Sequence, residues 1–504
     1  MPTIQGFLTQ AILSGIILLF SRFLWNYLRS PLKSFPGPWQ TSFTNIWRFI
    51  ETYQGRCELT HLELHRKLGS AIRIGPNVLS LSDPGLISEV YTVRDPWLKS
   101  DLYTVNDIKA NGMRIKNLFS HQDEKWHSKH LRPVKNLYSM TKVQDVEPAI
   151  DVMISSFTDK IRERFTQPGK ICQISDYITF LSWDVMGQVT FSKDLGILEA
   201  GFDHQNLLET SSKSLDYFAS ICQIPKLDFL LDKNPICRVG PPSFGWATGF
   251  SVGQYQTRLA DGDSIKGRVA DYMDKFIALK DKHTDTVDDN TVIMYMLSNV
   301  IAGGDTTAST MISVIYHVLK HPNVYKKLCD ELRSAKLTLP AQWKEIVSLP
   351  YLDAVIREAM RISPGLAMVI ERIVPKGGFS LPDGRFVAEG TIVGMNPYVI
   401  HRDSTVYGAN VDSFIPERWL PAKGESEEVY ESRVKKMKGS QLNFGAGPRS
   451  CLGRHLAQLE VYKVIATIFT EFDMELPSLD HEWNVINSWF VRQENIPVTI
   501  TEAS

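Results

Sequence analysis

The most informative segment of the chain is Leu442-Asn-Phe-Gly-Ala-Gly-Pro-Arg-Ser-Cys-Leu-Gly-Arg454, which lies close to the C-terminus. Its three glycines and one proline predict a tight loop, and a helical pattern of apolar residues follows from Arg454 to Phe472. The loop therefore delivers Cys451 to the start of a helix, where backbone N–H groups and Arg449 favour a thiolate by lowering the pKa of the thiol. An incidental cysteine in a structural glycine loop would not require the whole pattern FxxGxRxCxG, which is completed by Phe444, Gly447, Arg449, Cys451 and Gly453.

A second unusual segment is Ala302-Gly-Gly-Asp-Thr-Thr307, inside an apolar stretch from about Thr291 to Lys320. The stretch predicts one helix about 45 Å long, enough to cross a whole domain. Adjacent glycines cost about 1 kcal/mol each relative to alanine inside a helix. Their presence in a predicted helix therefore marks either a functional site or a close contact with another helix. Close packing alone does not explain the polar Asp305 and Thr306 in apolar surroundings.

A third segment, Glu358-Ala-Met-Arg361, lies on a predicted helix between Pro350 and Pro364. Side chains three residues apart share a helical face, so a surface ion pair worth roughly a few tenths of a kcal/mol explains this spacing alone. Its place before the cysteine segment, with Pro416-Glu-Arg-Trp419 between them, gives it more weight.

These segments, in this order and spacing, resemble the cytochrome P450 superfamily of haem-thiolate monooxygenases, and within it the pisatin-demethylase-like group of fungi. The resemblance covers about residues 35 to 495. It implies the cytochrome P450 fold, with Cys451 as the axial ligand of the iron of haem b, because thiolate ligation favours O–O cleavage. It also implies that Gly447 and Gly453 let the backbone approach the macrocycle, and that Phe444 packs beside the sulfur.

The same resemblance assigns roles to the other two segments. Thr306 is expected to hydrogen-bond dioxygen, and Asp305 to relay protons towards it where the helix opens locally, because O–O cleavage needs general-acid catalysis. Glu358, Arg361 and Arg418 are expected to form a buried charge network that holds the loop near the cysteine, which is a structural role.

Haem propionates need cations. By resemblance Arg449 and Arg372 donate to them, since guanidinium binds carboxylate in two-pronged fashion. Trp126 matches the tryptophan of the family's WxxxR element, but His130 stands where the arginine is expected. Either His130 or the neighbouring Lys129 must then serve the propionate, or water does.

The composition suits one large globular body. The chain has 504 residues, 43% of them hydrophobic, and its net charge of −1 gives no field that attracts nucleic acid. Residues 31–504 read as one mainly α domain with small peripheral β-sheets, because strand-like alternation is confined to about 70–82, 369–397 and 484–500. Asp383-Gly384 marks a hairpin, and six scattered cysteines predict no disulfide framework.

Residues 1–30 are expected to form one N-terminal transmembrane helix, because the run is apolar and about long enough to span a bilayer. Arg29 and Lys33 follow it, so the positive-inside rule places the catalytic domain in the cytosol. With the resemblance, this predicts a single-pass protein of the endoplasmic reticulum membrane. A stiff stretch around Pro36-Gly-Pro38 would separate anchor and body. A buried amphipathic helix is the alternative, although the segment lacks a polar stripe.

The expected redox partner is a separate NADPH–cytochrome P450 reductase, since the chain has no fused flavin domain. One set of basic residues is explained equally well as a docking patch for the reductase or as ordinary solvated surface charge, namely Lys125, Lys129, Arg132 and Arg454. The co-substrate implied is O₂.

The expected substrate is a hydrophobic small molecule, because segments that match the family's substrate contacts are apolar and bulky. They contribute Leu297, Val300, Ala302, Leu366, Met368, Val369, Trp489 and Phe490. The favoured function is monooxygenation of a terpenoid, polyketide or alkaloid in fungal secondary-metabolite biosynthesis. Detoxifying O-demethylation of a plant aromatic is an alternative, and a haem-binding sensor or isomerase that uses no reductase electrons is another. Intact Asp305 and Thr306 argue against the last.

Overall fold

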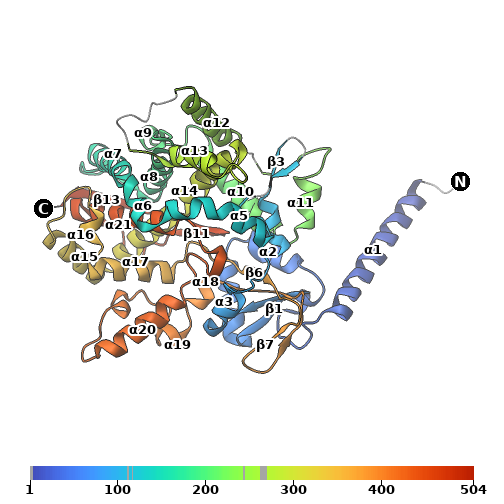
Figure 1. The fold of residues 1–504 in the computed structure, drawn as a ribbon. Helices are drawn as coiled ribbons and strands as arrows, with labels where there is room; N and C mark the ends of the chain where they lie inside the picture. The colour runs from blue at the N-terminus through green and yellow to red at the C-terminus, as the bar shows by residue number, and fades with distance from the viewer. Residues whose placement is uncertain (1–3, 111–112, 116, 242–243, 262–268, 504) are drawn as a thin grey trace.

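The computed structural model describes residues 4–110, 113–115, 117–241, 244–261 and 269–503, most of them in helices (Figure 1). The helices before the central one are α1 (Ile4–Arg29), α2 (Ile46–Tyr53), α3 (Cys57–Leu68), α4 (Ile87–Val90), α5 (Glu124–Lys135), α6 (Met140–Val143), α7 (Glu147–Phe165), α8 (Ile174–Phe191), α9 (Ile197–Ala200), α10 (Leu207–Ile221), α11 (Lys226–Leu231), α12 (Gly245–Ala260) and α13 (Tyr272–Lys282). The remaining helices are α14 (Asp289–Lys320), α15 (Pro322–Ser334), α16 (Trp343–Ile346), α17 (Pro350–Ile362), α18 (Pro397–Ile400), α19 (Ser404–Tyr407), α20 (Glu427–Gly439) and α21 (Arg454–Glu471). The mainly helical domain is confirmed.

Helix α14 runs through the middle of the body, with α8, α17 and α21 packed around it (Figure 1). The Asp288 side chain accepts the Thr291 N–H and begins the helix, and Pro322 follows its end. A Cβ at Gly303 would lie 2.5 Å from Met186 Sδ, so this glycine allows the close approach of α8. Because α14 is continuous, the local opening implied by the resemblance is wrong for this structure.

The strands form small separate sheets, as the composition and pattern predicted. The largest has the order β1-β2-β9-β6, in which only β2 and β9 are parallel; a second has the order β10-β13-β5, and the other three are two-stranded. The strand bounds are β1 (Ala71–Gly75), β2 (Val78–Leu81), β3 (Ile108–Ala110), β4 (Met113–Ile115), β5 (Cys172–Gln173), β6 (Ile370–Ile373), β7 (Phe379–Ser380), β8 (Phe386–Val387), β9 (Ile392–Met395), β10 (Phe472–Glu475), β11 (Asn484–Ser488), β12 (Phe490–Glu494) and β13 (Pro497–Glu502).

The three stretches expected to contain strands do contain them, and Asp383-Gly384 connects β7 to β8 with Gly384 at φ +85°. The expectation that strands are confined to those stretches is wrong, since β3, β4, β5 and β10 lie outside them. These strands have two to four residues each, which is too few to show alternation in a sequence. Among the described residues no cysteine is paired, in agreement with the expectation.

Helix α1 extends away from the body (Figure 1), and its last turn contacts the body at two points. Asn26 Nδ2 donates to the Phe43 carbonyl over 2.7 Å, and Tyr27 stacks on the Phe43 ring. Leu32 and Phe35 are buried against the largest sheet, so the Pro-rich stretch belongs to the body and is not a free spacer. Within the described part of the chain, no helix combines the length and the apolar character needed to cross a membrane.

Candidate functional site

Cys451 lies at the end of a loop that its own backbone closes. The Cys451 N–H donates to the Phe444 carbonyl over 2.8 Å. At Gly447, where φ is +66°, a Cβ would lie 2.1 Å from the Tyr91 carbonyl oxygen, so this glycine serves the contact with Tyr91. No described atom lies within 4 Å of the position that a Cβ at Gly453 would take. Gly453 therefore borders open space, whereas Gly447 packs on Tyr91, and the expected approach of both to the macrocycle stays a prediction.

The Cys451 side chain has accessible surface. Even so, burial raises the pKa of its thiol, and the Gly453 N–H and the Arg454 charge offset that effect only in part. The predicted lowering of this pKa is wrong because desolvation of the thiol outweighs the effect of the N–H groups at the start of the helix. A thiolate at this position is therefore favoured only when a cation lies beside it.

Three buried cations lie close together beside this loop. Lys99 and Arg372 are each 4% exposed, and the Arg449 side chain is 2% exposed. Arg449 Nε donates to Glu124 Oε1 over 2.8 Å, while its Nη2 finds no hydrogen-bond partner among the described residues. Burial lowers the pKa of Lys99 well below its ordinary value, and the charges of Arg372 and Arg449 lower it further. Arg372 and Arg449 against the one Glu124 carboxylate leave one positive charge unbalanced, and Lys99 can gain a second when an anion lies beside it.

Helix α5 presents Trp126 and His130 as a stacked pair, with ring centroids 3.8 Å apart. His130 Nδ1 lies 2.8 Å from the Trp126 carbonyl oxygen, so one ring nitrogen is already engaged. Lys129 Nζ donates to the Asp285 carbonyl over 3.2 Å at the protein surface. Lys129 is therefore occupied away from the buried cations, and the expectation that it could replace the missing arginine is wrong.

Two residues of this region, Lys99 and His127, were not predicted from the sequence. His127 is buried, and its Nδ1 has no partner in the described part of the chain. Burial lowers the pKa of His127 to about 3, and Arg449 and Lys99 contribute in the same direction. Both residues are brought to Arg449 by tertiary contacts, because neither belongs to a local motif.

The two polar residues of the central helix point in different directions. Thr306 Oγ1 donates to the Ala302 carbonyl over 2.7 Å, and Ala302 is exposed although it lies in the middle of α14. Asp305 Oδ1 accepts from Trp183 Nε1 over 2.8 Å, and Oδ2 accepts from Ser211 Oγ over 2.5 Å. Burial raises the pKa of Asp305, which these donors lower in part. The Asp305 carboxylate is therefore held by α8 and α10.

Tyr138 lies between α14 and the cysteine loop. Asn299 of α14 accepts from the Tyr138 hydroxyl over 2.7 Å, and its Nδ2 donates to Thr190 of α8 over 3.1 Å. Burial raises the pKa of Tyr138, and Tyr272 and Cys451 add to that shift. Tyr138 thus connects α14 with the cysteine.

The charge network predicted around Glu358 is present and buried. Arg361 Nη2 donates to Glu358 Oε1 over 2.8 Å, with both side chains 0% exposed, and Arg418 Nε reaches the same oxygen over 2.9 Å. Trp419 Nε1 donates to Glu358 Oε2 over 2.9 Å. Arg361 also donates to the His401 carbonyl, and His401 Nε2 accepts the N–H of Leu442, the first residue of the cysteine loop. The network therefore reaches that loop through His401.

Four aromatic rings pack edge to face beside Lys99, whose Nζ lies over the rings of Tyr103 and Phe119. Trp489 lies 5.8 Å from Tyr103, 5.8 Å from Phe119 and 5.0 Å from Phe218 between ring centroids. Trp489 has φ +74°, an uncommon conformation for a bulky residue, which turns its ring into this cluster. Met368 packs in the same cluster, so two of the predicted substrate residues meet here.

The other predicted substrate residues divide between this cluster and other parts of the body. Leu366 pairs with Phe490 and adjoins the aromatic cluster, whereas Leu297 and Val300 are buried in the helical core. Val369 packs on the largest sheet. Met368 and Val369 line a small cavity whose other walls are Leu102 and four polar residues, namely Arg48, Thr52, His61 and Gln223. A partly polar cavity therefore lies beside residues that were expected to form an apolar pocket.

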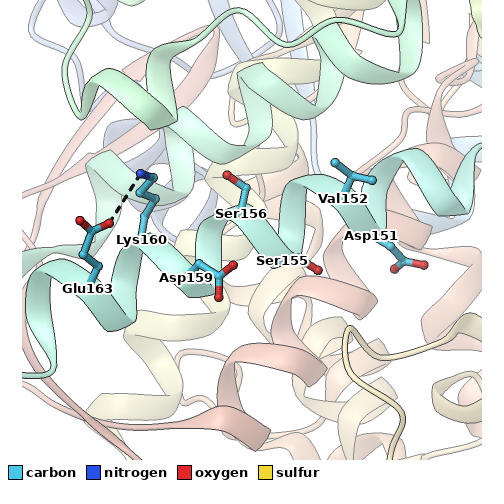
Figure 2. A pocket seen from close by; sticks show the side chains of 7 residues that line it. All are labelled: Asp151, Val152, Ser155, Ser156, Asp159, Lys160 and Glu163. Atoms are coloured by element: carbon cyan, nitrogen blue, oxygen red, sulfur yellow. Dashed lines mark ion pairs between the residues drawn. The ribbon is translucent and has the colours of Figure 1, made fainter.

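Figure 2 shows a surface hollow along α7, lined by Asp151, Val152, Ser155, Ser156, Asp159, Lys160 and Glu163. All seven residues come from one helix, so no second element lines the hollow. An open hollow of this kind lacks the convergent polar groups of a ligand site.

Comparisons with known proteins agree with this geometry. A family model described as Cytochrome P450 matches residues 17–499. The chain belongs to the cytochrome P450 family. "Cytochrome P450 monooxygenase cfoH" of Aspergillus candidus is 38% identical over 491 residues, which is 96% of this chain and 91% of that protein. "Cytochrome P450 monooxygenase cicH" of Emericella nidulans is 35% identical over 477 residues, or 92% of each chain. The protein is thus a haem-thiolate monooxygenase.

The residues of this cytochrome P450 fit a haem. Its two propionates carry two negative charges, which the unbalanced arginine and the buried Lys99 amine would neutralise. The partnerless Arg449 Nη2 and the accessible Cys451 sulfur supply a donor and a ligand of the required kinds. Charge and ligand therefore agree with one another.

Proposed function

We propose that this cytochrome P450 inserts one oxygen atom of O₂ into a hydrophobic small molecule of fungal secondary metabolism, such as a terpenoid, polyketide or alkaloid. The observation that carries the proposal is the exposed Ala302 in the middle of α14, with the Thr306 hydroxyl on its carbonyl and an aromatic cluster nearby. Gly365 connects the two, because its Cβ position lies 3.8 Å from the Thr306 carbonyl and Leu366 follows it. Fungal cytochrome P450 monooxygenases are the similar proteins.

The cofactor of the proposal is haem b, which supplies reductive activation of dioxygen when electrons arrive from NADPH through a separate reductase. Cys451 would hold the iron, and Arg372, Arg449, Lys99 and His127 would hold the propionates. Trp126 and His130 border that cluster as a stacked pair. Gly453 leaves room beside the ligand.

The chain's own proton chemistry centres on α14. Thr306 carries a hydroxyl on the accessible face, where it can donate to dioxygen after leaving the Ala302 carbonyl. Asp305 is a general acid that is hydrogen-bonded to Trp183 and Ser211, and its raised pKa favours the protonated form that a proton donor needs.

Replacement of Thr306 by alanine is expected to keep haem and substrate binding, while more of the reducing equivalents leave as hydrogen peroxide. The reason is the loss of the one hydroxyl on the accessible face at this turn. Loss of a positioned proton donor typically costs about a hundredfold or more in product formation. Product and peroxide per NADPH consumed give the measurement. Thr307→Ala is the control, because Thr307 is buried in the helix packing, and equal peroxide yields in both variants would exclude this role of Thr306.

Lys99→Met is expected to accelerate haem loss by about ten- to a hundredfold, the range of one hydrogen bond to a charged group. It should change the stability of the haem-free protein much less, because burial already lowers the pKa of Lys99 and the substitution removes only its hydrogen bond to the Phe119 carbonyl. Transfer of haem to an acceptor protein and thermal unfolding without haem measure the two effects. Lys129→Met is the matched control, since Lys129 is bound to Asp285 at the surface. Faster loss from the control would contradict the assignment.

We also propose that the protein is attached to the endoplasmic reticulum membrane, with the catalytic domain in the cytosol and residues 1–30 as a single-pass anchor. Exposed apolar side chains on α1 support this, including Leu18 at 70% and Phe20 at 68%. A second set of exposed apolar side chains supports it as well, on or next to α2 and α11. It comprises Trp39, Ile46, Ile50, Tyr53, Phe229, Leu230, Ile236 and Val239. Both helices lie on the side from which α1 extends (Figure 1).

A chain that starts at Ser30 is expected to bind haem normally and to move partly into the soluble fraction. Part should remain on membranes through the α2–α11 surface, and Leu230→Glu with Ile236→Glu should release it, since these side chains are 71% and 93% exposed. Flotation with vesicles measures the attachment. Phe202→Glu, at an exposed site outside this surface, is the control. A folded truncation without haem would show that residues 1–30 do more than anchor.

The proposed reductase docking patch lies on the cysteine side. Lys125, Arg132 and Arg454 are exposed there, and the Arg449–Glu124 ion pair holds α5 against the cysteine loop. Reductase-dependent NADPH consumption separates a monooxygenase from a haem-binding sensor or isomerase. Metabolite profiling of a deletion strain separates biosynthesis from O-demethylation of a plant aromatic, because the substrate accumulates.

A further inference from the structure

Glu460 is a carboxyl group that none of the roles above uses. It lies on α21, is 0% exposed, and neither carboxyl oxygen has a hydrogen-bond partner among the described residues. A buried carboxyl group without partners is strongly disfavoured in its charged form. Burial raises the pKa of Glu460 to about 8, so the group is neutral at pH 7.

The surroundings of Glu460 contain no cation that acts on it. The one group that lowers its pKa is the Ser182 hydroxyl of α8. The charged groups on the elements packed against α21 are engaged elsewhere: Lys463 with Glu147 and Asp151, Arg357 with Asp353, Arg333 with Asp473, Asp184 with the N–H groups of Leu195 and Leu198, and Asp305 with Trp183 and Ser211.

Ser182 connects Glu460 to the central helix. Its side chain is 0% exposed, and its Oγ donates to the Gly304 carbonyl over 2.8 Å. The next residue of α8, Trp183, donates to the next residue of α14, Asp305. A Cβ at Gly304 would lie 2.6 Å from the Trp183 ring, so the two helices are in close contact here. Consecutive residues of α8 therefore hold consecutive residues of the dioxygen-activating stretch.

We propose that Glu460 is a positioning residue that controls the Ser182–Gly304 hydrogen bond. Neutral Glu460 leaves the Ser182 hydroxyl on the Gly304 carbonyl, and ionised Glu460 takes that hydroxyl for itself. A hydroxyl has one proton to donate, and a carboxylate is a stronger acceptor than a backbone carbonyl. The only covalent change is the transfer of the Glu460 proton to solvent. This inference rests on the monooxygenase function and adds pH control of the α14 stretch to it.

The test uses the reduced, haem-loaded full chain with carbon monoxide as the probe. The C–O stretching frequency responds to polar groups near the bound gas, so it should change as the pH rises through about 8. In Glu460→Gln, which stays neutral, the frequency should not change over this range. The infrared band of a protonated buried carboxyl should be present in the native protein at neutral pH and missing from Glu460→Gln. Glu471→Gln, at the other end of α21, should behave as the native protein does.

Ser182→Ala provides a second, independent variant. It should keep the Glu460 carboxyl band, shifted in frequency, and lose the pH response of carbon monoxide. The proposal is overturned if Glu460→Gln or Ser182→Ala keeps the native pH response, or if the native protein lacks the carboxyl band. Where Glu460→Gln fails to take up haem, Ser182→Ala alone decides. A native protein without the red-shifted carbon monoxide complex would contradict the haem-thiolate function itself.

Discussion

Cys451→Ser is expected to abolish the strongly red-shifted absorption band of the ferrous carbon monoxide complex. The band requires a thiolate opposite the gas, and a serine hydroxyl does not ionise at neutral pH to replace it. Monooxygenase activity should vanish with the band, because thiolate ligation is what favours O–O cleavage. The variant should still fold, since the loop is closed by the Cys451 backbone N–H and the Phe444 carbonyl, which the substitution keeps.

The matched control is Cys329→Ser, a buried thiol on α15. It should retain the band and the activity. An unchanged band in Cys451→Ser would remove the assignment of the ligand. Loss of the band in both variants would point to a folding defect, which circular dichroism of the two proteins distinguishes.

Arg361→Leu is expected to destabilise the protein by about 3–5 kcal/mol, which is a large part of the 5–15 kcal/mol typical of a folded domain. The substitution leaves the Glu358 carboxylate buried with one of its cations removed, and frees the carbonyls of His401, Val411 and Ser413. Because His401 holds Leu442, we expect the cysteine loop to loosen and haem uptake to fail. Denaturant unfolding and haem content measure both effects.

Arg357→Leu is the control, because Arg357 lies on the same helix in a partly exposed pair with Asp353. It should cost about 1 kcal/mol or less. Arg361→Leu with native stability and full haem would show that the network does not hold the loop.

The pH dependence of this network follows from Glu358. Its two arginines hold the pKa of the Glu358 carboxyl below its ordinary value in spite of burial. A depressed pKa contributes stability above the unfolded value and loses it as the pH falls, so the difference between the native protein and Glu358→Gln should fade below about pH 4. A constant difference down to acid pH would contradict this.

Several features of the fold were predictable because they depend on local pattern. The long helix around Gly303, the helix after Cys451 and the hairpin at Asp383-Gly384 each follow from residues close in sequence. Strands β3, β4, β5 and β10 were missed since their short lengths carry no periodicity. Val369 was grouped with Trp489 because both lie in segments that match the family's substrate contacts, whereas the Val369 side chain packs on the largest sheet.

The functional site likewise divides into features that local sequence patterns predicted and features that they did not. Motifs identified Cys451, Thr306 and the Glu358 network, and the network is present as expected. The direction of the thiol pKa was predicted wrongly, because a local argument includes helix N–H groups and omits desolvation by the rest of the fold. Lys129 was offered as a donor from spacing alone, and its contact with Asp285 comes from a distant part of the chain.

The amino-acid sequence alone indicated the family and the central helix and predicted the ligand, since a glycine-rich cysteine loop and a polar break in an apolar helix are local conflicts that only a function resolves. The folded structure alone showed that Lys99 and His127 join Arg449, and that Glu460 lies beside Ser182. Burial and unbalanced charge arise from side chains far apart in sequence. They exist only after tertiary packing has removed the solvent between them.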